Sequence, residues 1–129
     1  MMKRSLILVL SLLMLVLCIP ALAESTDWNY DANYAVLRGY EGAGGDVVVP
    51  AEIDGFTVDV IGVSVFKGDT ITSLTLPETV LELRSNAVAS CEKLASVTLP
   101  QSLVVINRMN FFSCTALSEV TIPAGVRYI

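Results

Sequence analysis

The chain has 129 residues, 8 Lys and Arg against 13 Asp and Glu, a formal net charge of −5 and no histidine. An acidic chain repels phosphate backbones and anionic lipid surfaces, so we expect neither nucleic acid nor a membrane surface as a partner. Without an imidazole, a glycine-rich phosphate loop or a paired carboxylate motif, we expect no enzyme activity, no catalytic residues and no cofactor. Lys67 and Lys93, the remaining candidate bases, lie in predicted turns with no evident partner.

Residues 1–23 have the features of a secretory signal peptide. Lys3 and Arg4 form a positive start, residues 6–19 are apolar, and residues 21–23 read Ala-Leu-Ala, the small-residue pattern before a cleavage site. The apolar stretch is short for a membrane span, which needs about 20 residues. Cleavage would leave residues 24–129 with a net charge of −7, because the −5 of the whole chain loses two positive charges. We therefore predict a secreted or cell-surface protein.

Residues 24–46 are predicted to form an N-terminal capping segment. Aromatic residues alternate there, which indicates an extended chain with one face covered: Trp28, Tyr30, Tyr34 and Tyr40. A cap of this kind would shield the apolar end of a stack of repeats. The same rings have polar tips and flat faces that suit sugars, so contacts with sugars remain an alternative role for them.

The capping segment also contains four alternating oxygen-bearing residues, as at the start of a calcium loop: Asp27, Asn29, Asp31 and Asn33. Such a loop needs glycine at its sixth position and glutamate at its twelfth, to turn sharply and to chelate the ion. Ala32 and Arg38 occupy those positions here. We therefore predict a solvated strand or turn and no metal site.

Residues 47–129 are repetitive. One phrase occurs three times and ends at Pro77, Pro100 and Pro123, a period of 23 residues. This period lies within the range of leucine-rich-repeat solenoids. The first coil opens before Pro50 and is longer, because a turn is inserted at residues 53–56. The sequence predicts about three coils and an incomplete last coil that reaches Ile129.

Seven apolar columns recur at fixed distances from these prolines. They are Val80, Leu103 and Val126; Leu83, Ile106 and Ile129; Val88 and Phe111; Cys91 and Cys114; Leu94 and Leu117; Val97 and Val120; Leu99 and Ile122. One coil cannot offset the cost of ordering its own backbone, so coils must stack. The cysteine column favours two buried free thiols, although export leaves a disulfide between them as an alternative.

Polar residues between the columns are the candidate binding surface. We predict that they form parallel rows on the outer face of the repeated strands: Ser73, Thr75, Ser96, Thr98, Glu119 and Thr121. Repeat proteins commonly bind partners on such a face. The alternative is that threonine is present because it favours strands.

The columns, together with the Phe-Phe-Ser-Cys element at residues 111–114, resemble the BspA-like leucine-rich-repeat family of bacterial surface and secreted proteins. The segments at residues 45–50 and 53–62 resemble the first unit of that family. Val88 replaces the family's usual phenylalanine, and Asn110 stands where alanine is common. The resemblance implies adhesion or host interaction, as in some members, and an extracellular protein or glycan as partner.

The columns predict a short leucine-rich-repeat solenoid of the α/β horseshoe class. The asparagine ladder of better-known leucine-rich repeats is absent, since Thr79, Ser102 and Gly125 occupy that area. We therefore expect strands joined by irregular or 3₁₀ return paths with little regular helix. Our functional hypothesis is a protein- or glycan-binding module. The alternative is a structural solenoid fragment that docks onto further repeats or another chain, and its open last coil is a candidate for self-association.

Overall fold

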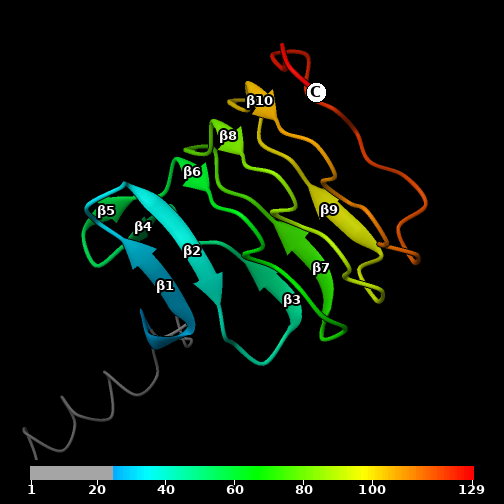
Figure 1. Ribbon diagram of the computed structural model, residues 1–129, viewed down its shortest axis with the longest axis horizontal. Helices are drawn as coiled ribbons and strands as arrows, with labels where there is room; N and C mark the ends of the chain where they lie inside the picture. The colour runs from blue at the N-terminus through cyan, green and yellow to red at the C-terminus, as the bar shows by residue number, and fades with distance from the viewer. Residues whose placement is uncertain (1–24) are drawn as a thin grey trace, which may run out of the picture.

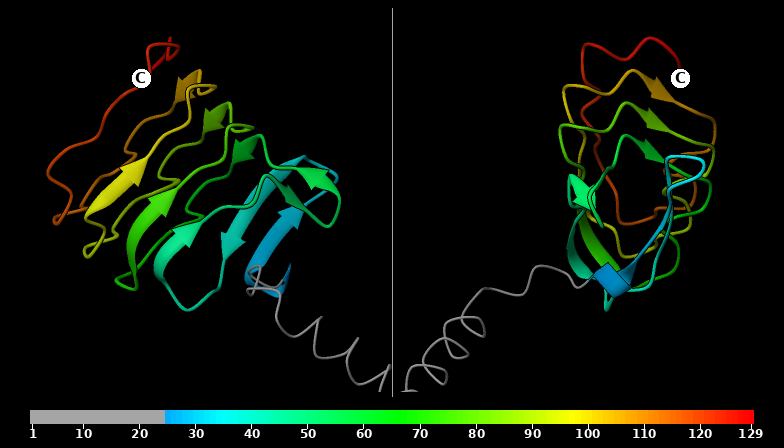
Figure 2. Two further views of the ribbon diagram at one scale, coloured as in Figure 1. Left: turned by 180° about the vertical axis from the view of Figure 1, so that it is seen from behind. Right: turned by 90° about the vertical axis from the view of Figure 1, so that its left-hand side faces the viewer.

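In the computed structural model, which describes residues 25–129, the chain winds into a short β-solenoid with two walls of strands (Figure 1). The predicted signal peptide lies outside the described residues. Along the stack, the first wall has the order β1-β2-β6-β8-β10 and the second has the order β3-β7-β9. Figure 2 shows the two walls on different sides of the flattened coil.

The first wall consists of β1 (Trp28–Asp31), β2 (Val36–Tyr40), β6 (Val60–Ile61), β8 (Glu82–Leu83) and β10 (Val105–Ile106). The second wall consists of β3 (Gly45–Val48), β7 (Ile71–Thr75) and β9 (Ser96–Thr98). A separate hairpin is formed by β4 (Glu52–Ile53) and β5 (Phe56–Thr57). The described residues contain one short 3₁₀ helix, η1 (Ser25–Asp27), and no α-helix.

The repeated phrase builds the second wall. Its strands pair in parallel, so that Leu74 lies between Val47 and Val97. Proline has no backbone N–H to continue the ladder, and Pro77 and Pro100 follow these strands. Each proline carbonyl then accepts the N–H three residues later, which turns the chain toward the first wall. The return paths are irregular, as the sequence predicts.

The first wall carries a second inward column. Leu37, Ile61 and Leu83 pair in register across β2, β6 and β8, and Ile106 continues the column on β10. All four are buried, and they belong to the same core as the apolar residues of the second wall. One continuous core therefore fills the space between the walls.

The predicted columns are the core through the inner coils but not through the last one. Leu83, Val88 and Leu94 are fully buried, whereas Ile122 is 43% exposed and Ile129 is 86% exposed. The inner coils are covered from both sides, and no further coil within the described residues covers these two isoleucines. They belong to the end face of the stack.

The insertion in the first coil is a hairpin. β4 and β5 pair antiparallel, and the two residues between them, Asp54 and Gly55, have φ angles of 51° and 83°. Positive φ at both positions is typical of the tight turns that connect two twisted strands. The extra residues project from the coil, while Ile53 and Val58 remain in the core.

The N-terminal segment forms an antiparallel hairpin that extends the first wall. β1 pairs with β2, and Leu37 of β2 pairs in parallel with Ile61 of β6. Trp28 and Val36 are buried at this end of the stack. β3 begins at Gly45, so the second wall starts inside the segment 24–46 that was predicted as a cap.

Two hydroxyl groups join neighbouring coils where other leucine-rich repeats have asparagine. Thr79 Oγ1 donates to the carbonyl of Val58 at 2.6 Å, and Ser102 Oγ donates to the carbonyl of Val80 at 2.8 Å. Each of these part-buried hydrogen bonds satisfies a backbone carbonyl group of the preceding coil. Gly125, the next member of the column, has no side chain with which to continue this row.

Candidate binding surfaces

The second wall brings four of the six predicted binding residues together. Ser73 pairs with Ser96 and Thr75 with Thr98 in the ladder between β7 and β9. Ser73 Oγ also donates to Asp46 Oδ1 of β3 at 2.7 Å. The side chains are short and exposed or half-buried, because the inward positions alternate with them along each strand. The result is a shallow polar surface formed by two parallel rows.

Glu119 and Thr121 do not join these rows, and this part of the prediction is wrong. Both residues are exposed, but residues 117–122 form no strand and have no ladder to β9. Figure 1 shows this part of the last coil swinging away from β9. An edge position alone does not explain the missing ladder, because β3 at the other edge of this wall is fully paired with β7.

Three of the four aromatic residues serve packing. The Trp28 ring lies 4.7 Å from that of Tyr40 and 6.4 Å from that of Phe66, between centroids. Tyr30 stacks on Phe56 at 5.7 Å, and its hydroxyl donates to a backbone carbonyl. Tyr34 differs from them, because it lies in the turn between β1 and β2 with 70% of its surface exposed. It alone of the four presents a mostly exposed ring to a ligand.

Of the four alternating oxygen-bearing residues, Asp31 stabilises a turn. Asp31 Oδ1 accepts the backbone N–H groups of Asn33 and Tyr34, and Asp31 Oδ2 contacts Arg38 Nε at 2.9 Å. The carboxylate is therefore already used by the hairpin. Among residues 25–129, no group of three or more potential ligands is placed to hold a metal ion.

The candidate nucleophiles and bases lie in structural positions. Cys91 and Cys114 are buried free thiols. Burial, and secondarily the neighbouring Cys114, raises the pKa of the Cys91 thiol to about 11, so the reactive thiolate is scarce at neutral pH. Lys93, for which the sequence offered no partner, contacts Asp69 through Nζ and Oδ2 at 3.7 Å on the surface.

A hollow that the sequence did not predict lies on the outer face of the first wall. It has a volume of about 270 Å³ and is lined by Val36, Arg38, Gly62, Val63 and Arg84. Arg38, Gly62 and Arg84 directly follow the paired residues Leu37, Ile61 and Leu83. An alignment of the capping segment with the coils would have shown the two arginines on either side of a glycine.

Gly62 keeps the floor of this hollow open. Its N–H donates to the carbonyl of Leu37 at 2.8 Å, and a Cβ at this position would lie 2.6 Å from the same oxygen. A side chain there would force the backbones of β2 and β6 apart. The close approach of the two strands therefore requires glycine and leaves a gap between Arg38 and Arg84.

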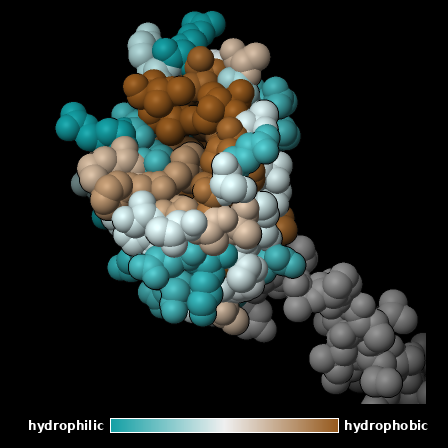
Figure 3. Space-filling view, turned by 90° about the vertical axis from the view of Figure 1, so that its right-hand side faces the viewer, coloured by the Kyte–Doolittle hydropathy of each residue, from teal (hydrophilic) through white to brown (hydrophobic). Residues whose placement is uncertain are grey.

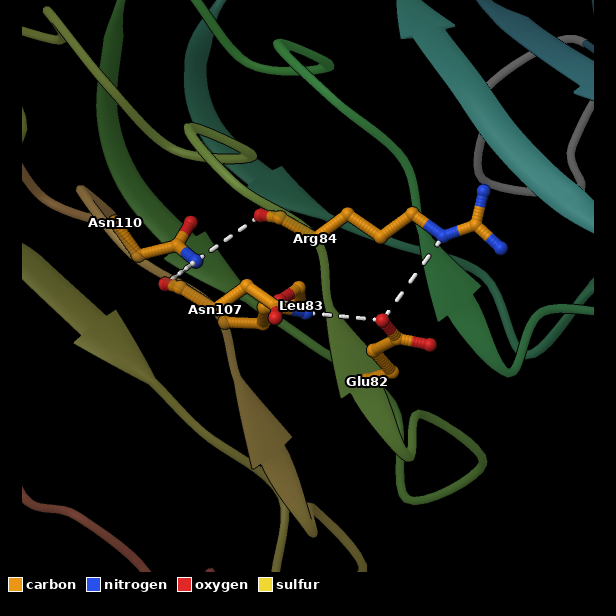
Figure 4. Close-up of polar contacts among 5 residues, drawn as sticks. All are labelled: Glu82, Leu83, Arg84, Asn107 and Asn110. Atoms are coloured by element: carbon orange, nitrogen blue, oxygen red, sulfur yellow. Dashed lines mark hydrogen bonds and ion pairs between the residues drawn. The ribbon is translucent and has the colours of Figure 1, made fainter. Parts of the chain in front are cut away.

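A polar network beside the hollow joins the coils of β8 and β10 (Figure 4). The Asn107 amide donates to Glu82 Oε1 at 2.9 Å and to the carbonyl of Leu83 at 3.2 Å. The Asn110 amide donates to the carbonyls of Arg84 and Asn107. Asn110, a departure from the family pattern, thus bonds backbone groups of two coils and has a structural role.

No helix within the described residues is long and apolar enough to cross a membrane. A search of the curated proteins found no match. The chain is similar to the crystal structure of a leucine-rich repeat protein of T. pallidum, with a TM-score of 0.73 and 26% identity over 83% of this chain. It spans about half the length of that protein, 51%.

A second solved structure, a leucine-rich repeat protein of Bacteroides capillosus, has a TM-score of 0.68 and 32% identity, covering 79% of this chain and 81% of that one. The family model described as the BspA type leucine rich repeat region matches residues 52–129 in six copies. The match confirms the resemblance inferred from the columns, and the solved structures confirm the solenoid fold. The chain belongs to the BspA-type leucine-rich repeat family.

Proposed function

We propose that this chain is a secreted or cell-surface binding module without enzyme activity, which contacts an extracellular protein or glycan through the outer face of β3, β7 and β9. The observation that carries the proposal is the pair of in-register rows on that face. Asp46, Ser73 and Ser96 form one row, and Thr75 and Thr98 belong to the other. The features of a signal peptide at residues 1–23 support an extracellular location.

The size of this surface limits the affinity. A standard protein interface buries about 800 Å² on each partner, and three short strands provide little area compared with that. Short hydroxyl side chains lose little rotamer entropy on binding, but they also bury little apolar area. We therefore expect affinities on the order of 1 μM, the middle of the range for transient contacts.

A binding panel of matrix proteins and glycans tests this proposal. Wild-type protein at micromolar concentration should retain at least one partner, and Thr98→Arg should weaken that binding about tenfold by placing a bulky charge in the second row. Thr57→Arg is the matched control, because Thr57 is exposed on the separate β4–β5 hairpin. Failure to retain any partner would contradict the proposal.

The end face of the stack supports a second candidate, a structural role in which this face docks onto another chain. β9 is paired on one side only, and Ile122 and Ile129 of the last coil are exposed on the end face, Ile129 next to Tyr128, which bridges to Val105 of β10. Figure 3 shows hydrophobic residues gathered around a hollow on this side of the molecule. Apolar surface next to an open strand edge favours association.

Light scattering after size exclusion tests this second candidate. If the end face docks onto a second copy, the wild-type mass should rise with concentration, and Ile122→Glu should remain monomeric. Val63→Glu controls for the added charge, because Val63 is an exposed apolar residue of the first wall. A wild-type monomer at every concentration would argue against self-association through this face.

A further inference from the structure

We propose that the hollow between Arg38 and Arg84 binds the carboxylate of an acidic sugar. The two arginines are brought to the same level of the first wall by the register of β2, β6 and β8. Guanidinium groups bind carboxylates through paired, charge-assisted hydrogen bonds. The site lies on a different wall from the rows of β7 and β9. A substitution can therefore remove binding at one surface without changing binding at the other.

Arg84 is available for a ligand. Its Nε lies 4.0 Å from Glu82 Oε1, too far for a hydrogen bond, and among residues 25–129 this is its closest acidic group. The same Glu82 oxygen accepts the Asn107 amide at 2.9 Å, which holds the carboxylate away from Arg84. Figure 4 shows the Arg84 side chain extending from β8 toward β6, and Gly62 directly follows β6 in the chain.

Arg38 is already oriented. Its Nε contacts Asp31 Oδ2 at 2.9 Å, and Asp31 is itself fixed by two backbone N–H groups of the turn. The contact uses one of the five N–H donors of the guanidinium, so the terminal amino groups remain for a ligand. A side chain that is already ordered loses less entropy when it binds.

The surroundings favour a sugar that carries one acid group. Val63, an exposed residue of the lining, provides apolar contact for C–H groups. The exposed ring of Tyr34 lies next to the lining residue Arg38, whose guanidinium carbon is 5.2 Å from the ring centroid. Aromatic and apolar surfaces suit the apolar faces of sugar rings.

Charge also argues against a polyanion. Asp31 and Glu82 flank the two arginines, and acidic residues outnumber basic ones by 13 to 8 in the chain. These two acidic groups offset the two guanidinium charges, so one carboxylate is held by directional guanidinium hydrogen bonds, and each further negative charge of a long polymer would meet repulsion. A single terminal acidic sugar therefore fits the site better than a sulfated chain.

Amide chemical shifts recorded by NMR during titration with methyl glucuronoside test the proposal. The expected result is a saturable shift of Gly62 and Val63 with a dissociation constant on the order of 1 mM. Methyl glucoside, which has the same ring without the carboxylate, should bind about tenfold more weakly. Arg84→Gln should cause a similar loss for the glucuronoside, whereas Arg127→Gln, which removes an exposed arginine outside the hollow, should cause none.

Three results would overturn the proposal. Equal binding of the glucoside and the glucuronoside would remove the role of the carboxylate. Equal binding by Arg84→Gln, with wild-type thermal stability as proof of folding, would remove the role of Arg84. Sodium sulfate that shifts the same amides as strongly as the glucuronoside, at matched ionic strength, would show a general anion site and not one for acidic sugars.

Discussion

Met109 is an unfavourable residue in a recurring backbone turn. Ser64, Asn86 and Met109 lie in one column, two residues before Phe66, Val88 and Phe111, and all three have φ between 54° and 61°. Left-handed backbone is costly for most side chains and is tolerated best by glycine and asparagine. Met109 is half exposed and is not part of the buried core.

Replacing Met109 with asparagine should therefore stabilise the protein. The expected gain is up to about 1 kcal/mol, measured as a higher Tm, because asparagine relieves the strain at little loss of packing. The reverse change, Asn86→Met, places methionine in the equivalent turn and should lower Tm. A lower Tm for Met109→Asn would show that its side chain contributes more than the backbone strain costs.

The buried thiol of Cys91 predicts a loss of stability at alkaline pH. Its pKa is raised from 9.0 to about 11, first by burial and then by Cys114. The unfolded thiol releases its proton at a lower pH, so the unfolded state binds fewer protons than the folded state between these values. The contribution of the Cys91 thiol to the free energy of unfolding is complete below pH 9, and it is lost as the pH rises through about 11.

Thermal unfolding from pH 8 to pH 11 measures this effect, and Cys91→Ala is the variant that isolates it. Burial, followed by the Asp59 charge, also raises the pKa of Tyr30. Tyr30 therefore also contributes to the loss of stability at alkaline pH, and its part will remain in the Cys91→Ala variant. Wild type should lose more stability than Cys91→Ala over this range. Parallel curves for the two proteins would contradict the assignment.

Some residue roles follow from the sequence, and others need the register of strands. The aromatic alternation predicts that Trp28 and Tyr40 cover an end, and both pack there on Phe66. It does not predict that Tyr34 is exposed, because that depends on the turn held by Asp31. The hollow at Arg38 depends on pairing between segments that share no repeated phrase.

At the scale of elements, the phrase ending at Pro123 does not form the strand that its two earlier copies form. The third copy has the same alternation, but Glu119 stands where the earlier copies have Ser73 and Ser96, and glutamate is depleted in strands. An edge position alone does not account for the difference, since β3 and β9 are each paired on one side only and still form strands. Sequence periodicity predicts the columns, but it does not predict which coils form a complete ladder.

Hydrogen exchange should show this difference directly. Amide groups of residues 118–122 should exchange early, because they lack the ladder bonds that protect a strand. Those of β7, which lies between two strands, should be the slowest of the second wall. Residues 126–128 are the internal comparison, since the N–H of Arg127 donates to Val104 and the carbonyl of Tyr128 accepts from Ile106. Protection at 118–122 equal to that of β7 would indicate a third paired strand.

At the scale of the whole molecule, the two walls have different surface chemistry. The second wall presents rows of short hydroxyl side chains that begin at Asp46 and Val48 of β3, whereas the first wall presents two arginines beside a gap made by Gly62. A shared core holds both walls, so a substitution on one outer face leaves the other in place. This separation allows the binding role proposed for each wall to be measured in one protein.

The proposed binding surface for an extracellular partner is the outer face of β3, β7 and β9. The most direct measurement compares wild type, Thr98→Arg and Arg84→Gln on the same panel of matrix proteins and glycans, with methyl glucuronoside as an added probe. We expect Thr98→Arg to bind the retained panel partner about tenfold more weakly but to keep its affinity for the glucuronoside, and Arg84→Gln to keep the panel partner but to bind the glucuronoside about tenfold more weakly. Retention of the panel partner by Thr98→Arg at wild-type affinity would contradict the proposed binding surface.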